Sequence, residues 1–165
     1  QGQGLGYASG QYFSLGLERA ALENATATAV CGAIIEQGEQ VFLEKTPNGF
    51  RPPQIARPDR GRLRNDLSDD LAARGITIGL GPAYSVFDDA RHRTHYAYYL
   101  ATGSAEIVSS DLQAVAIRDL AALSYVSPAV AEMMARFALE SRTRSFGLYL
   151  GDAKRGDVHP QSERT

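Results

Sequence analysis

Residues 62–74 form the segment that most constrains the fold. The segment contains no glycine or proline, and Leu63, Leu67 and Leu71 recur at every fourth position, which places them on one face of a helix. Gly75 follows immediately, as a C-terminal cap should. The sequence therefore predicts an amphipathic helix here, whose leucine stripe must be buried against another layer.

The segments on both sides of this helix have the composition of strands and turns. Residues 26–35 are apolar and rich in β-branched side chains, and residues 40–45 alternate after a turn at Gly38. Residues 46–49 have strong turn composition, and the prolines in residues 50–60 exclude regular helix. Further strands are predicted at residues 11–14, 76–78, 84–87, 95–101 and 146–150.

Two more helices are predicted near the C-terminus, with a short helical turn at residues 17–25. Ser110 or Asp111 can cap a helix that runs to about residue 123, and Ser127 precedes a proline at the start of a helix over residues 129–140. Strands do not alternate regularly with helices, which disfavours a doubly wound sheet. An α/β fold with a mixed sheet between helices fits better.

The chain length of 165 residues suits one domain. We expect it to occupy residues 26–150, followed by a polar tail at residues 151–165. Residues 1–25 are expected to be the end of a preceding domain or a linker. Because the first residue is Gln1 rather than methionine, the chain is expected to be part of a longer protein.

Composition narrows the class of partners. The net charge of −2 does not suit a dedicated nucleic-acid binder, and no apolar stretch is long enough to cross a membrane. The single cysteine, Cys31, excludes an internal disulfide and is expected to be a small core residue. A lone thiol suits the cytoplasm.

Three carboxylates lie along the predicted helix at residues 62–74. Asp66, Asp69 and Asp70 are spaced at i, i+3 and i+4, so they share one helical face. Such a cluster of oxygen ligands suits Mg²⁺ or Mn²⁺, and all three aspartates would be metal-binding and catalytic only if the chain is a metal-dependent hydrolase. The alternative is a solvated face whose charge is balanced by neighbouring arginines: Arg62, Arg64 and Arg74.

Other residues suit an anionic ligand. Arg51 and Arg57 belong to a basic run interrupted by prolines, whereas Arg93, His95 and Tyr99 lie around the start of a predicted strand. Arginine binds phosphate through paired N–H donors, and a tyrosine ring can stack on a base. The alternative is a solvated loop and hairpin. Strand alternation predicts that Tyr99 shares one face of the strand with His95, and that Tyr96 and Tyr98 share the other face. One of these two rows of tyrosines must be partly exposed or face a ligand.

The order of these features resembles the Nudix superfamily. Residues 31–45, an apolar strand that turns and returns as V-F-L-E-K, resemble the opening hairpin of that family. Residues 48–53, N-G-F-R-P-P, resemble the N-G-x-W-x-x-P that leads into the Nudix box, and residues 75–76 match its last glycine and apolar residue. The resemblance covers about residues 26–140 and implies an α/β/α sandwich with a mixed sheet.

The box itself departs from the family pattern, G-x5-E-x7-R-E-U-x-E-E-x-G-U, where U is apolar. Residues 54–55 replace the two glycines, and no glutamate occurs between Glu44 and Glu106. One register places residues 65–70 on R-E-U-x-E-E and keeps the acidic positions as aspartate. The other register keeps Leu71 and Gly75 at their box positions and places Ala72 and Ala73 at the glutamate pair. We favour this register because a packing stripe and a helix end are harder to move than surface charges.

The resemblance implies two functions. The family's chemistry is metal-assisted attack of water on a diphosphate. Because the box glutamates are missing, we expect a degenerate domain that binds a nucleotide-like or other phosphorylated ligand, or a partner, without hydrolysing it. The alternative is a divergent hydrolase that holds Mg²⁺ or Mn²⁺ at Asp66, Asp69 and Asp70. A homodimer is compatible with either.

Residues 10–16, G-Q-Y-F-S-L-G, carry a second, shorter resemblance. They are similar to the closing G-x-Y-x-x-L strand of flavin-reductase-like FMN-binding domains. This resemblance implies that the chain is the back part of a longer protein and acts there as an accessory module.

Overall fold

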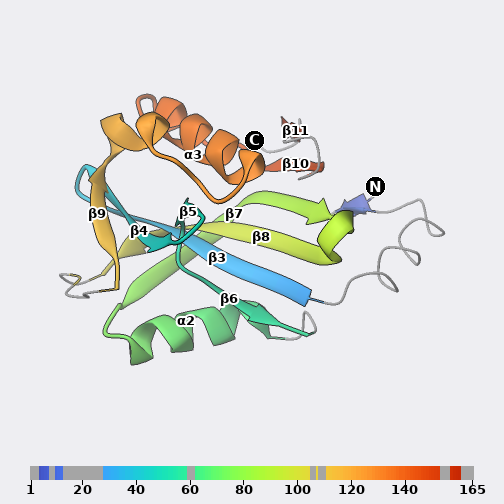
Figure 1. The fold of residues 1–165 in the computed structure, drawn as a ribbon, viewed down its shortest axis with the longest axis horizontal. Helices are drawn as coiled ribbons and strands as arrows, with labels where there is room; N and C mark the ends of the chain where they lie inside the picture. The colour runs from blue at the N-terminus through green and yellow to red at the C-terminus, as the bar shows by residue number, and fades with distance from the viewer. Residues whose placement is uncertain are drawn as a thin grey trace.

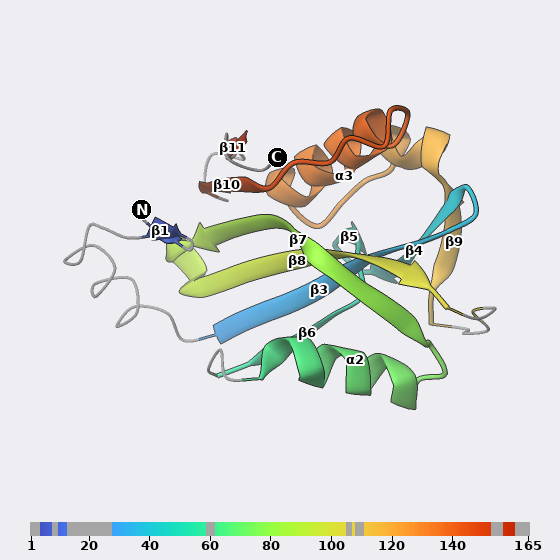
Figure 2. The same cartoon turned by 180° about the vertical axis from the view of Figure 1, so that it is seen from behind.

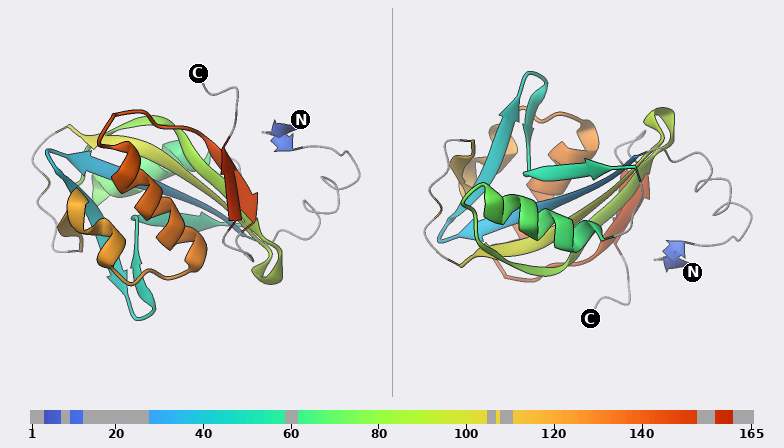
Figure 3. Two further views of the ribbon diagram at one scale, coloured as in Figure 1. Left: turned by 90° about the horizontal axis from the view of Figure 1, so that it is seen from above. Right: turned by 90° about the horizontal axis from the view of Figure 1, so that it is seen from below.

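A computed structural model describes residues 4–7, 10–12, 28–58, 62–104, 107, 111–152 and 157–160. In these residues a mixed β-sheet lies between two α-helices, one on each face (Figure 1), and the view from behind shows the same layers (Figure 2). Seen from above and from below, each helix crosses its own face of the sheet (Figure 3). The helices are α2 (Leu63–Ala73) and α3 (Pro128–Glu140), and the 3₁₀ helices are η1 (Ala90–His92) and η2 (Ile117–Ala122).

Nine of the described strands form one sheet: β3 (Thr28–Gln37), β4 (Gln40–Thr46), β5 (Gly49–Arg51), β6 (Gln54–Arg57), β7 (Ile78–Asp89), β8 (Thr94–Gly103), β9 (Gln113–Ala116), β10 (Tyr149–Asp152) and β11 (Asp157–Pro160). Their order is β11-β10-β7-β8-β3-β4-β5, with β6 paired to β3 and β9 paired to β4. β3 and β8 are parallel, as are β7 and β10, and the other pairs are antiparallel. The predicted mixed α/β sandwich is confirmed. Two further strands, β1 (Gly4–Tyr7) and β2 (Gly10–Tyr12), pair separately.

Helix α2 confirms the helix predicted from the leucine stripe. Leu67 and Leu71 are fully buried and pack on the sheet in a cluster that includes Cys31, and each such leucine contributes about 1.5–3 kcal/mol. Gly75 has a φ of +81°, and the N–H of Ile76 donates to the Leu71 carbonyl at 2.8 Å. This Schellman-type end satisfies carbonyls that the helix leaves unpaired and directs the chain into β7.

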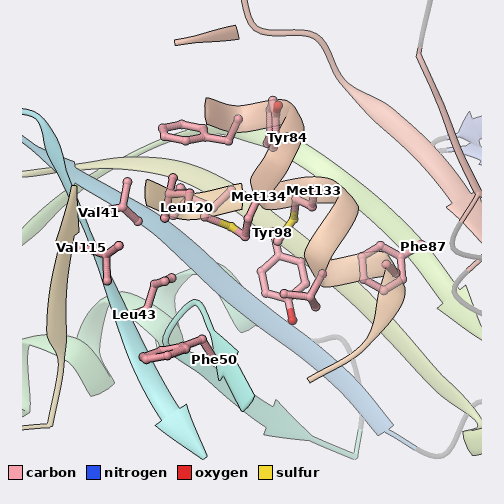
Figure 4. Close-up of a cluster of buried hydrophobic side chains, with 14 residues drawn as sticks. Val41, Leu43, Phe50, Tyr84, Phe87, Tyr98, Val115, Leu120, Met133 and Met134 are labelled. Atoms are coloured by element: carbon pink, nitrogen blue, oxygen red, sulfur yellow. The ribbon is translucent and has the colours of Figure 1, made fainter. Parts of the chain in front are cut away.

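Helix α3 covers the opposite face of the sheet. The Ser127 hydroxyl accepts a hydrogen bond from the Val130 N–H at 3.2 Å, so the predicted cap is confirmed. Met133 and Met134 of α3 lie against Tyr98 and other buried side chains of the sheet (Figure 4). The domain therefore has a hydrophobic cluster on each side of the sheet.

The helix predicted at residues 111–123 is wrong. This segment forms strand β9 and then η2. Val115 is buried opposite Val41 of β4, and the Ile117 N–H donates to the Glu39 carbonyl at 3.0 Å. Pairing with the edge of β4 supplies hydrogen bonds that compete with helix formation, and local composition does not record this distant partner.

The later strands also differ in extent from the prediction. The segments predicted at residues 76–78 and 84–87 belong to one strand, β7, whose register with β8 shifts on both sides of Ala83, next to Pro82. A bulge is where a sheet tolerates proline. The last predicted strand begins at Tyr149 rather than at residue 146.

Some predictions fall where the structure gives no description. The helical turn at residues 17–25 and the end of the strand at residues 11–14 lie outside the described residues. The domain boundaries stay predictions. Neither described α-helix has the length and apolar character that a membrane span requires.

Candidate functional site

The three aspartates of α2 do not share one centre. Asp66 lies 3.8 Å from Nε of Arg57, Asp70 lies 3.7 Å from Arg74, and Asp69 is exposed. Within the described ranges, no three His, Cys, Asp or Glu side chains are grouped so that they could hold a metal ion. The side chains present therefore do not fit the Mg²⁺ or Mn²⁺ site that their spacing suggests.

An arginine–carboxylate cluster, made of Glu44, Arg51, Asp70, Arg74 and Asp111, lies beside α2. Arg74 reaches Glu44 at 3.5 Å, Asp70 at 3.7 Å and Asp111 at 3.9 Å, and Nε of Arg51 lies 2.7 Å from the other Glu44 oxygen. The Glu44 and Arg74 side chains are only 15% and 24% exposed. The protein thus supplies its own cation to carboxylates from β4, from α2 and from the segment before β9.

The end of α2 agrees with the second box register. Leu71 is buried and Gly75 has the positive φ that ends the helix, so both anchors of that register have a structural role. Ala72 and Ala73, at the positions of the glutamate pair, are exposed. In this register the helix lacks the pair of carboxylates that the box carries.

A cavity of about 470 Å³ lies on the α2 side of the sheet, between the start of the helix and strands β3 and β8. We call it the His95 pocket. His95, Ala97 and Tyr99 line it together, as strand alternation predicts. Its described lining is Cys31, Arg62, Leu63, Arg64, Asn65, His95, Ala97 and Tyr99.

Two arginines and a histidine line the His95 pocket. Nδ1 of His95 lies 2.7 Å from an Asp88 oxygen, and the His95 side chain is 12% exposed. The Arg64 guanidinium lies 4.7 Å from the centre of the Tyr99 ring, and its Nη1 donates to the Gly81 carbonyl at 3.0 Å. Among the described lining residues none is a carboxylate, so the pocket suits an anion.

Cys31 borders this pocket but is a core residue, as predicted. It is 1% exposed, and burial raises the pKa of its thiol to about 11. Because the thiolate is the reactive form, this cysteine is suited to packing and not to nucleophilic chemistry.

The predicted ligand residues are divided between several places. Only His95 and Tyr99 line the pocket; Arg51 belongs to the arginine–carboxylate cluster, and Arg57 faces Asp66. Arg93 ends η1 with a φ of +52°, and its carbonyl accepts the N–H at the start of β3. The five predicted residues therefore do not surround one pocket, and their role in ligand binding stays a prediction.

Four lining residues come from the N-cap and first turn of α2: Arg62, Leu63, Arg64 and Asn65. The sequence indicated the two arginines only as charge balance or as part of a basic run, Leu63 only as part of the leucine stripe, and Asn65 only as the first residue of one box register. The available signal was their position, because the first turn of a helix that packs on a sheet lies close to the sheet residues it covers.

The second tyrosine row belongs to the core. The rings of Tyr96 and Phe87 stack with centres 4.9 Å apart, and Tyr98 is fully buried and donates to Oε1 of Gln54 at 2.7 Å. Burial raises the pKa of Tyr98. Tyr98 is therefore a core residue, whereas Tyr96 and Tyr99 are both partly buried, so each row keeps one partly exposed tyrosine.

Comparison with solved structures identifies the fold. A Nudix hydrolase from Nitrosomonas europaea superposes with a TM-score of 0.65 at 14% identity, over 77% of this chain and 78% of that one. The chain has the Nudix fold. A putative oxidoreductase from Sinorhizobium meliloti 1021 superposes with a TM-score of 0.62 at 27% identity, over 79% of this chain and 46% of that one.

Sequence comparison gives a relative of a different name. The chain is 34% identical over 161 residues to a probable flavin reductase of Rhizobium meliloti (strain 1021). The aligned residues cover 95% of this chain and 50% of the relative. That name is consistent with the resemblance of residues 10–16. No family model matches the chain. The chain spans about half the length of this relative and of the oxidoreductase.

Proposed function

We propose that this chain is a non-hydrolytic Nudix-fold domain that binds a phosphorylated ligand in the His95 pocket. The observation that carries the proposal is the position of Arg74, whose guanidinium lies 3.5–3.9 Å from three carboxylates beside the box helix. A divalent cation at these carboxylates would have to displace a partly buried guanidinium, and like-charge repulsion opposes its approach.

The remaining carboxylates of α2 support the same proposal. Asp66 is engaged by Arg57, and Asp69 is exposed. Alanines occupy the positions of the glutamate pair in the register that the helix end favours. Aspartate is also one methylene shorter than glutamate, which hinders the tight octahedral geometry that Mg²⁺ demands.

Binding in the His95 pocket is supported by its charge and size. Arg62, Arg64 and His95 provide N–H donors to an anion, and arginine pairs with phosphate through two parallel hydrogen bonds. The volume of about 470 Å³ lies within the range of roughly 300–1,000 Å³ that is usual for small-ligand pockets.

The place of this domain in a larger protein is part of the proposal. The matched segment spans 50% of the relative named probable flavin reductase and 46% of the putative oxidoreductase, so each of these proteins is about twice as long as the segment. We infer that the domain is an accessory module that makes up about half of such a protein. Binding of a phosphorylated ligand to this domain would then regulate the rest of the protein.

One experiment separates binding from hydrolysis. Calorimetry with MgCl₂ and MnCl₂, and phosphate release from a panel of nucleoside diphosphate compounds, should show neither metal binding nor turnover for the wild type. Metal binding and turnover that vanish together in Asp66→Asn/Asp69→Asn/Asp70→Asn, but persist in the exposed-site control Asp119→Asn, would overturn the proposal in favour of a hydrolase.

Binding of a phosphorylated ligand in the His95 pocket is tested with ribose 5-phosphate. Arg62→Ala and His95→Gln should each weaken its binding by roughly 10- to 150-fold, the range expected for one charge-assisted hydrogen bond. Arg118→Ala, an exposed arginine on η2, is the matched control and should leave binding unchanged. Equal affinities in all four proteins, or no binding to any, would refute a phosphate site in this pocket.

A further inference from the structure

We infer that the ligand of the His95 pocket carries a planar heteroaromatic ring, and that Arg64 occupies the position of this ring on Tyr99 in the free protein. The inference rests on the proposed function, because it assumes that the phosphate binds in the same pocket. The ligand class is a phosphate monoester with a flat ring, which includes adenosine 5′-phosphate (AMP) and flavin mononucleotide (FMN).

Tyr99 provides a fixed stacking surface. It lies on β8, where it is paired on one side with Ala33 of β3 and on the other with Ala83 of β7. A strand held on both edges gives its side chain a constant direction. Burial raises the pKa of Tyr99, so the ring stays neutral. A neutral aromatic ring on a fixed backbone is the surface that proteins use to stack bases.

Arg64 shows where a flat group fits. Its planar guanidinium lies 4.7 Å from the centre of the Tyr99 ring, and Nη1 of the same side chain donates a hydrogen bond to the Gly81 carbonyl at 3.0 Å. An exposed contact of this kind corresponds to about two- to fivefold in an equilibrium constant. Stacking of a base on an aromatic side chain corresponds to about 5- to 150-fold, so a ring can replace the guanidinium.

The displaced arginine remains useful to the ligand. Arg64 is on the first turn of α2, next to Arg62 and Asn65, so its guanidinium stays at the edge of the pocket when it leaves Tyr99. At the edge of the pocket the guanidinium can form hydrogen bonds to the phosphate of the ligand. A ligand that has a ring but no phosphate cannot form this pair. The geometry therefore favours a ligand that carries both groups over a ligand that carries either alone.

Calorimetry on the full chain with AMP, FMN and ribose 5-phosphate tests this inference. AMP or FMN should bind more tightly than ribose 5-phosphate, by up to about 75-fold once the loss of the Arg64–Tyr99 contact is subtracted, and whichever is tighter identifies the ring. Tyr99→Phe keeps the ring and should keep this difference, whereas Tyr99→Leu should abolish it. Equal affinity of all three compounds for the wild type would overturn the inference and leave the proposed function intact. Failure of all three to bind would overturn the proposed function itself.

A second measurement does not depend on the folding of Tyr99→Leu. Arg64→Ala frees the ring face without changing Tyr99, so adenosine, which has no phosphate, should bind about two- to fivefold more tightly than to the wild type. Arg118→Ala again serves as the control and should leave adenosine binding unchanged. Adenosine affinity that is unchanged or reduced in Arg64→Ala would show that the guanidinium does not hold the place of a ring.

Discussion

Gly49 should not tolerate replacement by alanine. Its φ is +129°, and a Cβ added there would lie 2.7 Å from the Tyr125 carbonyl carbon and 2.9 Å from the Ser124 oxygen. These atoms cannot easily move, because the Phe50 N–H donates to the Ser124 carbonyl at 2.8 Å and the Val126 N–H donates to the Phe50 carbonyl at 3.1 Å. Gly49→Ala therefore combines backbone strain with overlap of main-chain atoms, at a cost of about 3 kcal/mol or more.

Gly38 is the matched control for this substitution. Its φ is +65°, but a Cβ there meets no atom within 4 Å, so Gly38→Ala should cost only the roughly 1–2 kcal/mol of the left-handed backbone. For a domain of this size, the expected fall in Tm is about 2–4 °C for each kcal/mol, hence at least about 6 °C for Gly49→Ala. Urea and thermal unfolding followed by circular dichroism measure both. A Gly49→Ala protein no less stable than Gly38→Ala would refute the reasoning from main-chain overlap.

Three further changes have defined outcomes. Arg74→Ala should raise the affinity for Mn²⁺, because Glu44 and its neighbours lose the internal cation; calorimetry that finds no change would contradict this role. The urea midpoint should fall as pH rises from 9 to 11, because burial raises the pKa of Cys31 to about 11 and also raises the pKa of Tyr84 and Tyr98, so the unfolded chain releases these protons first; Cys31→Ala should reduce the fall between pH 9 and 10, and an unchanged fall there would contradict the role of the thiol. Glu140→Ala should cost about 1–3 kcal/mol in urea unfolding, because the buried Tyr84 hydroxyl loses its acceptor at 2.9 Å, and a Glu140→Gln protein equally destabilised would argue against this cause.

The elements that the sequence predicted well carry their own local signals. The leucine stripe and Gly75 fix both the buried face and the end of α2, and Ser127 with Pro128 fixes the start of α3. These signals lie within one or two helical turns, so they do not depend on how distant segments meet.

The features that were missed depend on distant partners. Residues 113–116 become a strand because the edge of β4 is free to pair with them. Glu44 and Arg74 are 30 residues apart and meet only because α2 packs beside β4, so the acidic face looked like a metal site before its arginine was visible. The pocket joins the start of α2 to alternate residues of β8, and only the β8 half could be foreseen.

The position of β8 between β3 and β7 has a consequence for hydrogen exchange. Its amides are enclosed by strands on both edges and by a helix layer on each face, so they should exchange only when the whole domain opens. A ligand held on Tyr99 binds only the folded state and lowers the population of that global opening. Occupancy of the pocket should therefore slow exchange throughout the sheet, including strands that lie beneath α3 and never touch the ligand.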